Sequence, residues 1–220
     1  MRRTAFLLVV LAGLSAAVAQ TPAPAERPPE RLPSISERVR SLSRQEGFLP
    51  YVWDERRGQL LLEIPSGLGD FLYGSGLASG AGLTEVSLDR GQLGQLGICR
   101  FQRVGPRVLL RQMQTTHRSG VSDAERTRVV EESFPSAVLA ALPIVAEEAD
   151  RVLVDATSFL LADSEIVPAL KQARLGDWKQ DLLRSSLSLS RSGAFPRNTE
   201  LEVLVTLTSE NPPRAVASVL

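Results

Sequence analysis

The sequence predicts an α+β fold with a mainly antiparallel sheet, built from hairpins with two or three inserted helices. Short β-prone runs follow one another around turn residues, which is typical of hairpins. Helix signals fall between such runs without alternating regularly with them, which argues against parallel βαβ units. A chain of 220 residues is long enough to bury a sizeable core in one domain or two small ones.

The first residues predict an export signal. Arg2 and Arg3 precede an apolar run from Ala5 to Leu14, and residues 17–19 supply an A-x-A cleavage site. The apolar run is shorter than the ~20 residues that span a bilayer. We expect a signal peptide over residues 1–19 and an exported protein, periplasmic or extracellular, with no membrane span after cleavage.

A proline-rich linker is expected over residues 20–33, because TPAPAERPPERLP favours extended polyproline II and offers little to bury. The predicted module then covers residues 34–220. It opens with a short helix, since Ser34 and Glu37 form a capping box and apolar residues follow at helical spacing. Gly47 is expected to end this helix.

Hairpins are expected next. FLPYVWD and QLLLEIP, at residues 48–54 and 59–65, are β-prone runs joined by the turn-like DERRG, and FLYGSG at 71–76 can continue the sheet. A further hairpin over residues 98–114 turns at Val104-Gly105-Pro106-Arg107. In the first of these runs, Tyr51 and Trp53 share one strand face, where a core role is commoner than ligand stacking.

The second half of the chain mixes both kinds of element. The longest helix is predicted over residues 122–142, bent or split at Pro135, and a second from Asp163 to Ala173, interrupted near its start by Pro168. Between them a strand pair over residues 143–161 turns at Glu147 to Asp150. TELEVLVTLTS, at residues 199–209, alternates like a strand with one buried face.

The glycine-rich stretch from Tyr73 to Gly97 raises the question of a ligand loop. It has neither the lysine of a G-x-x-x-x-G-K-[ST] phosphate loop nor G-x-G-x-x-G spacing before a helix. The favoured interpretation is that glycine supplies positive φ at turns or bulges. Within it, Asp89, Arg90 and Gly91 are candidates for a loop brace or for a domain interface.

No residue pattern predicts catalysis, a metal or a cofactor in this chain. His117 is the single histidine and Cys99 the single cysteine, so a zinc site of three or four ligands cannot be assembled from them. Cys99 lies in an alternating run and is expected in the core. The adjacent pairs Glu131-Glu132 and Glu147-Glu148 point apart and form no acid–base dyad.

The balance of positive and negative residues indicates which classes of partner the chain can bind. Lys plus Arg number 25 and Asp plus Glu number 25, and the two signs are interleaved. Such mixing is typical of a solvated surface, so nucleic-acid binding is not expected. Peptides or proteins remain as candidate partners.

The order of several strings resembles one family. EGFLPYVWDERRGQLLLEIP at residues 46–65, LDRGQLG at 88–94, VGPRVLL at 104–110 and LVDATSFLL at 153–161 are similar to exported bacterial zinc-dependent metallopeptidases. More narrowly, the chain from about Ser34 onward resembles the region of unknown function that precedes the catalytic domain in that family. The resemblance implies a catalytic domain further along, with an H-E-x-x-H helix that binds zinc.

This sequence contains no H-E-x-x-H motif, so no catalytic or metal residue transfers to it. The leading hypothesis is therefore a non-catalytic N-terminal module, accessory, folding or regulatory, whose partner is the downstream zinc domain. The chain stops soon after a patterned segment, which we interpret as truncation at the C-terminal end. The alternatives are a stand-alone envelope binding or scaffold protein and, as the weakest, a peptidase in its own right.

Overall fold

The computed structural model describes residues 31–80, 82–83, 86, 88–115, 128–129 and 132–217. The predicted signal peptide and residues 20–30 of the predicted linker lie outside these ranges. The described fold belongs to one compact unit, Leu32–Leu220.

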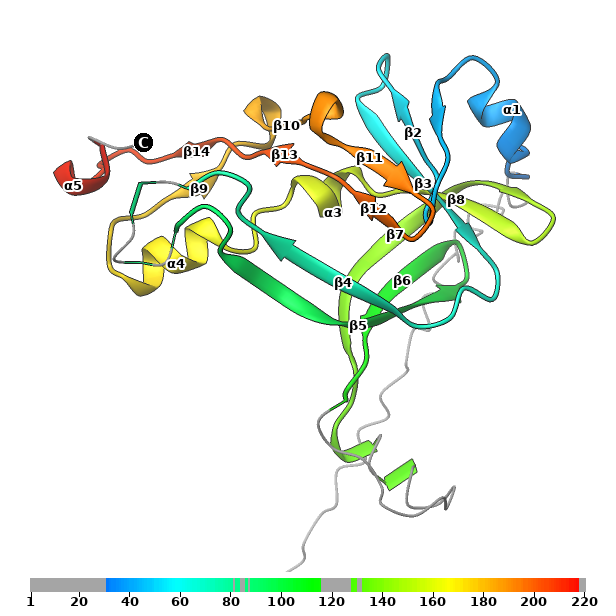
Figure 1. The fold of residues 1–220 in the computed structure, drawn as a ribbon, viewed down its shortest axis with the longest axis horizontal. Coiled ribbons are helices and arrows are strands. Elements are labelled where there is room, and N and C mark those ends of the chain that lie inside the picture. The colour runs from blue at the N-terminus through cyan, green and yellow to red at the C-terminus, as the bar shows by residue number, and fades with distance from the viewer. Residues whose placement is uncertain are drawn as a thin grey trace, which may run out of the picture. The chain divides into compact units, whose positions relative to one another are not determined.

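A curled antiparallel sheet of eight strands organises this unit (Figure 1). The strand order is β1-β2-β3-β8-β7-β6-β5-β4, and every adjacent pair is antiparallel. The strands are β1 (Arg44–Gln45), β2 (Tyr51–Asp54), β3 (Gln59–Pro65), β4 (Phe71–Gly76), β5 (Leu93–Val104), β6 (Arg107–Gln112), β7 (Ala137–Glu148) and β8 (Arg151–Asp155). The predicted hairpins β2–β3, β5–β6 and β7–β8 are confirmed, and so is the predicted strand at residues 71–76, which is β4.

The main core lies inside the curl of the sheet. Alternate residues of β3 face it, together with side chains from β2, β6, β7 and β8, because successive side chains of a strand point to opposite faces. Its buried members are Tyr51, Leu60, Leu62, Ile64, Val108, Leu142, Ile144, Val152, Val154 and Ala156. A second, smaller cluster of Ile35, Val52, Leu61, Ala146 and Leu153 lies on the opposite face under helix α1.

Helix α1 (Ile35–Val39) begins as the sequence predicts. The Ser34 hydroxyl accepts from the Glu37 N–H, and the Glu37 carboxylate accepts from the Ser34 N–H, so the capping box is complete. The prediction that Gly47 ends this helix is wrong. The helix ends at Val39, and Arg44–Gln45 already pairs with β2 as strand β1. Gly47 has another role, because a side chain there would collide with the backbone of Ala194.

The prediction of a helix as far as residue 142 is wrong. Residues 128–129 and 132–133 are helical, but Ala137–Glu148 is strand β7, which pairs with β6 and then β8. Pro135 favours extended backbone in the residue before it, which ends a helix there. After Pro135, the chain pairs with β6 on one side and β8 on the other. These backbone hydrogen bonds stabilise a strand although the alanines and valines have helical spacing.

Two short helices follow β8. The expected strand up to Leu161 is wrong beyond Asp155, because α3 (Thr157–Leu161) begins where the Asp155 carboxylate accepts from the Thr157 N–H and hydroxyl. Helix α4 (Ile166–Gln172) confirms the predicted second helix. Pro168 lies in its first turn, where the missing N–H costs no helix hydrogen bond.

The last segment forms short pairs in place of one strand. β9 (Lys179–Gln180) pairs with β14 (Leu207–Thr208), β10 (Ser186–Leu187) with β13 (Val203–Leu204), and β11 (Gly193–Phe195) with β12 (Asn198–Glu200). The 3-10 turns η2 (Leu182–Arg184) and η3 (Leu189–Arg191) and the helix α5 (Arg214–Ala217) complete the described chain. The predicted single strand over 199–209 is wrong, because its residues pair with three different partners.

Candidate functional site

Between β4 and β5 the glycine-rich stretch returns the chain from one strand to the other. We call the described residues between 77 and 92 the turn system. Gly82 and Gly91 have φ of 70° and 81°, which glycine adopts most readily, and the β4–β5 register shifts between Gly74 and Gly76. Backbone bonds close the turn: the Gly91 N–H donates to the Leu77 carbonyl at 2.8 Å. The predicted role of glycine in turns and bulges is confirmed at these positions.

Asp89, Arg90 and Gly91 lie at the exposed tip of this turn system. No ion pair joins the two side chains within the described part of the chain. The Asp89 carbonyl accepts from the Gln92 N–H at 3.1 Å, so the local bracing comes from backbone groups. A role in a domain interface stays a prediction.

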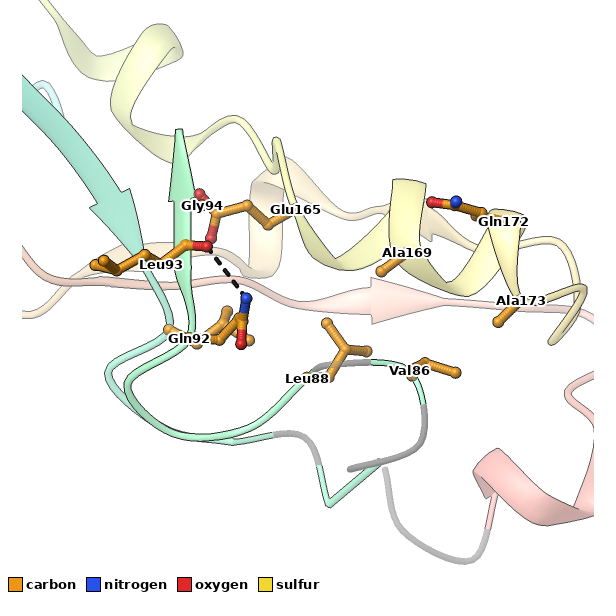
Figure 2. Close-up of a pocket in the computed structure, with 10 residues that line it drawn as sticks. Val86, Leu88, Gln92, Leu93, Gly94, Glu165, Ala169, Gln172 and Ala173 are labelled. Atoms are coloured by element: carbon orange, nitrogen blue, oxygen red, sulfur yellow. Dashed lines mark hydrogen bonds between the residues drawn. The ribbon is translucent and has the colours of Figure 1, made fainter. Parts of the chain in front are cut away.

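A groove of about 440 Å³ lies between this turn system and α4, and we call it the first groove (Figure 2). Its walls are mostly apolar and its polar members are Gln92, Gln172 and Glu165. Leu88 and Leu170 belong to a buried cluster that joins the turn system to α4 and α5. The apolar wall is formed by Leu77, Val86, Leu88, Leu93, Ala169 and Ala173.

Glu165 lies at one end of the first groove, beside Gly94 at the start of β5 (Figure 2). A Cβ at position 94 would overlap the Glu165 carboxylate in its present position, so a larger residue there would displace the end of this side chain. Burial first, and then the negative charge of Glu165, raise the pKa of Tyr73 above its usual value. The carboxylate therefore makes this end of the groove electronegative.

A second groove, of about 330 Å³, lies between α3 and the segment from η2 to β10. Leu183 at its rim is 99% exposed and Leu182 is 55% exposed. Trp53 and Leu60 contribute from β2 and β3, and Leu160, Leu161, Leu187 and Val203 complete the apolar lining. Such exposed large apolar side chains beside a cavity are typical of interaction surfaces.

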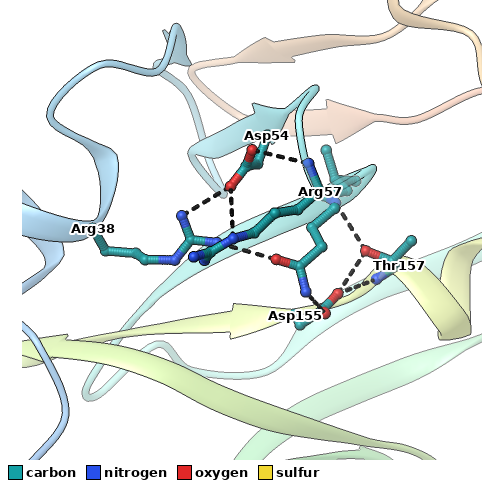
Figure 3. Close-up of polar contacts among 7 residues, drawn as sticks. Arg38, Asp54, Arg57, Asp155 and Thr157 are labelled. Atoms are coloured by element: carbon teal, nitrogen blue, oxygen red, sulfur yellow. Dashed lines mark hydrogen bonds and ion pairs between the residues drawn. The ribbon is translucent and has the colours of Figure 1, made fainter.

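A polar network anchors α1 to the sheet (Figure 3). Arg38 Nη1 lies 3.0 Å from Asp54 Oδ2, and Arg38 Nη2 donates to Gln59 Oε1 at 3.1 Å. The Gln59 amide donates to Asp155 Oδ2 at 2.8 Å. Burial acts to raise the pKa of Asp54, but hydrogen bonds from Arg38 and the Arg57 N–H outweigh it, so this pKa is lowered.

Other residues named from the sequence have structural roles. Cys99 is fully buried, as predicted, and burial raises the pKa of its thiol. Tyr51 is in the main core and Trp53 packs against it, which confirms their predicted core role. Glu147 pairs with Arg103, whereas Glu148 accepts from Ser36, so these neighbours point apart as expected.

His117 and Glu131 lie outside the described residues. Across the described ranges, no group of three or more His, Cys, Asp or Glu residues is arranged to hold a metal ion. None of the helices in the described part of the chain is both long enough and apolar enough to cross a membrane.

Sequence reasoning did not identify Glu165 or the two grooves. Glu165 lies in the first turn of the helix predicted from Asp163 to Ala173, where acidic residues are common. A signal was available in the sequence, because Asp163 and Glu165 flank Ser164 and only one of two such acids can cap the helix. The other acid is then left for a different role. Asp163 caps the helix, accepting from the N–H groups of Ile166 and Val167 at 2.8 and 2.6 Å.

Fold and grooves together define a mainly antiparallel β domain with short helices and two surface grooves. Comparison with family models matches residues 91–219 to a family described as a domain of unknown function (DUF5117). That range is more than half of the chain, and the chain belongs to this family. Searches of curated proteins and of solved structures found no significant match.

Proposed function

We propose that this chain is a non-catalytic N-terminal module of an exported zinc-dependent metallopeptidase-like protein. In this proposal the module packs against the peptidase domain and assists or regulates it. The motif order from residues 46 to 161 supports the association through its resemblance to that family. The observation that carries the packing role is the second groove, with the nearly fully exposed Leu183 at its rim.

Exposed leucines at such a groove favour burial against a partner. Moving an apolar side chain of this size out of water is worth about 1.5–3 kcal/mol. Trp53 and Leu60 already give the groove a rigid wall, since both belong to the sheet or pack on its core. A partner side chain entering between α3 and η2 would meet apolar atoms and a preformed surface.

The first test is genetic. The DNA that follows this coding sequence, read in all frames, is expected to encode an H-E-x-x-H motif. The proposal is contradicted if that DNA encodes an unrelated protein and no H-E-x-x-H motif in any frame.

The second test measures binding between this chain and that peptidase domain. Leu182→Ser with Leu183→Ser is expected to weaken binding at least tenfold while leaving the melting temperature unchanged, because both side chains are exposed. Leu72→Ser is the matched control, since Leu72 is 66% exposed on β4 and does not line the second groove. Equal loss in both variants, or no loss in either, would contradict a specific docking role.

A second candidate function is a stand-alone binding protein of the cell envelope. The first groove favours it, because a preformed apolar groove with one carboxylate at its end is suited to a ligand. Cavities of 300–1,000 Å³ with a few placed polar groups are typical of binding sites. A cooperative unfolding transition and a monomeric state without any peptidase domain are expected on this hypothesis.

A further inference from the structure

Among the described residues, the Glu165 carboxylate has no cationic partner, in contrast to the two buried carboxylates of this fold. Asp54 is paired with Arg38, and Glu63 is paired with both Arg44 and Arg151. Within the described ranges, Glu165 accepts only from the adjacent Ser164 hydroxyl, at 3.4 Å. A half-buried charge without a partner is unfavourable, and a ligand cation would relieve it.

The start of α4 does not account for this carboxylate. Asp163 takes the free N–H groups of the first turn, including that of Glu165 itself at 3.2 Å. The Glu165 side chain makes no capping hydrogen bond and is directed along the groove toward Gly94. Its position is therefore set by the surface of the groove and not by the helix end.

The rest of the first groove selects what kind of cation fits. Leucine and alanine side chains from the turn system and α4 line it, so an aliphatic stem would be buried there. Gln92 and Gln172 offer amide oxygens as further acceptors. A bare divalent ion is a poor match, because Ca²⁺ takes six to eight oxygen ligands and Mg²⁺ an octahedron of them.

We propose that the first groove binds the lysine or arginine side chain of a peptide, with the cation on Glu165 and the stem on the leucine–alanine wall. The inference concerns this chain by itself and holds whether or not a peptidase domain packs on the second groove. The two grooves have no lining residue in common. A failure at one groove is therefore distinguishable from a failure at the other.

The test uses the mature chain and two tripeptides, acetyl-Ala-Lys-Ala-amide and its norleucine counterpart, which keeps the stem and removes the charge. We expect saturable NMR shifts at the amides of Gly94, Ala169 and Ala173 with the lysine peptide, and at least tenfold weaker binding of the norleucine peptide. Raising the salt concentration from about 0.05 to about 0.5 M should weaken binding of the lysine peptide, because salt screens exposed charges.

Three variants locate the site. Glu165→Gln is expected to reduce affinity for the lysine peptide at least tenfold, and Gly94→Ala to reduce it by displacing the carboxylate. Glu55→Gln removes the same charge from the exposed β2–β3 turn and should bind like the wild type. Thermal melts check that each variant folds.

The proposal is overturned if the norleucine peptide binds as tightly as the lysine peptide. It is also overturned if Glu165→Gln and Gly94→Ala both fold and bind unchanged, or if the shifts fall on other parts of the chain.

Discussion

Asp54 links the stability of this fold to pH. Its carboxylate is shielded, it is paired with Arg38, and its pKa is lowered in the folded state. A group with a lowered folded pKa stabilises the protein fully above its unfolded pKa, and that stabilisation is lost as the pH falls through the folded pKa. The contribution of Asp54 is therefore complete at neutral pH and disappears in acid, below about pH 4.

Asp54→Asn should lower the free energy of unfolding by about 2 kcal/mol at pH 7, because it leaves the Arg38 guanidinium shielded without its counter-charge. The difference from the wild type should shrink as the pH falls below about 4. Urea denaturation at several pH values measures both.

Asp70→Asn is the matched control. Its partner is Arg100, and both side chains are about half exposed, at 42% and 52%. Exposed pairs contribute about 0–1 kcal/mol, so this variant should lose much less stability at pH 7. If both variants lose the same amount, the shielding of the Asp54 pair has no energetic consequence.

Gly91 and its two neighbours separate backbone bracing from side-chain bracing. Gly91→Ala should cost about 1–2 kcal/mol, because φ is 81° there and an L-residue pays for a left-handed conformation. Asp89→Ala with Arg90→Ala should stay within about 0.5 kcal/mol of the wild type, since both side chains are exposed and no ion pair joins them.

Urea denaturation of the wild type, of Gly91→Ala and of the double variant Asp89→Ala, Arg90→Ala measures these differences in the free energy of unfolding. A large loss in the double variant would support the side-chain brace predicted from the sequence. An unchanged double variant leaves Asp89 and Arg90 free for an interface role.

At the scale of elements, α4 and the turn system share one buried cluster, so each depends on the other for stability. Leu170 in α4 is fully buried against Leu83 and Leu88 of the turn and Val216 of α5. Leu170→Ala should lower the free energy of unfolding by about 2–5 kcal/mol through lost burial and a cavity. Leu96→Ala, at a leucine 54% exposed on β5, should cost much less.

Hydrogen exchange adds a local measurement to that prediction. In Leu170→Ala, amides of α4 and of the turn from Leu77 to Gln92 should lose protection before those of β3 and β8. Uniform loss across the sheet would show that the turn system is not a separate cooperative unit.

Elements with local signals could be predicted from the sequence. The capping box placed α1, and turn residues between alternating runs placed the hairpins β2–β3 and β5–β6. The first half of β7, residues 137–142, is predicted as helix, because alanine and valine at mixed spacing suit a helix and a strand alike. Its state is decided by pairing with β6 and β8, which are distant in the sequence.

At the scale of the whole molecule, the antiparallel architecture could be predicted but the grooves could not. Hairpins bring neighbouring strands together with little ambiguity, and this fixes most of the sheet. The grooves depend on how the turn system, α4 and the segment from η2 to β10 settle on that sheet. Glu165 and Gly94 meet only through this packing, so no local pattern around either residue indicates the other.

The position of Gly94 beneath Glu165 has an evolutionary consequence. The small residue at 94 leaves room for the end of a side chain contributed from a distant part of the chain, and the Gly94 backbone has no positive φ. A substitution at position 94 therefore changes where the Glu165 carboxylate lies. A lineage that enlarges residue 94 would move this carboxylate without any change at residue 165, because the end of a glutamate side chain can shift.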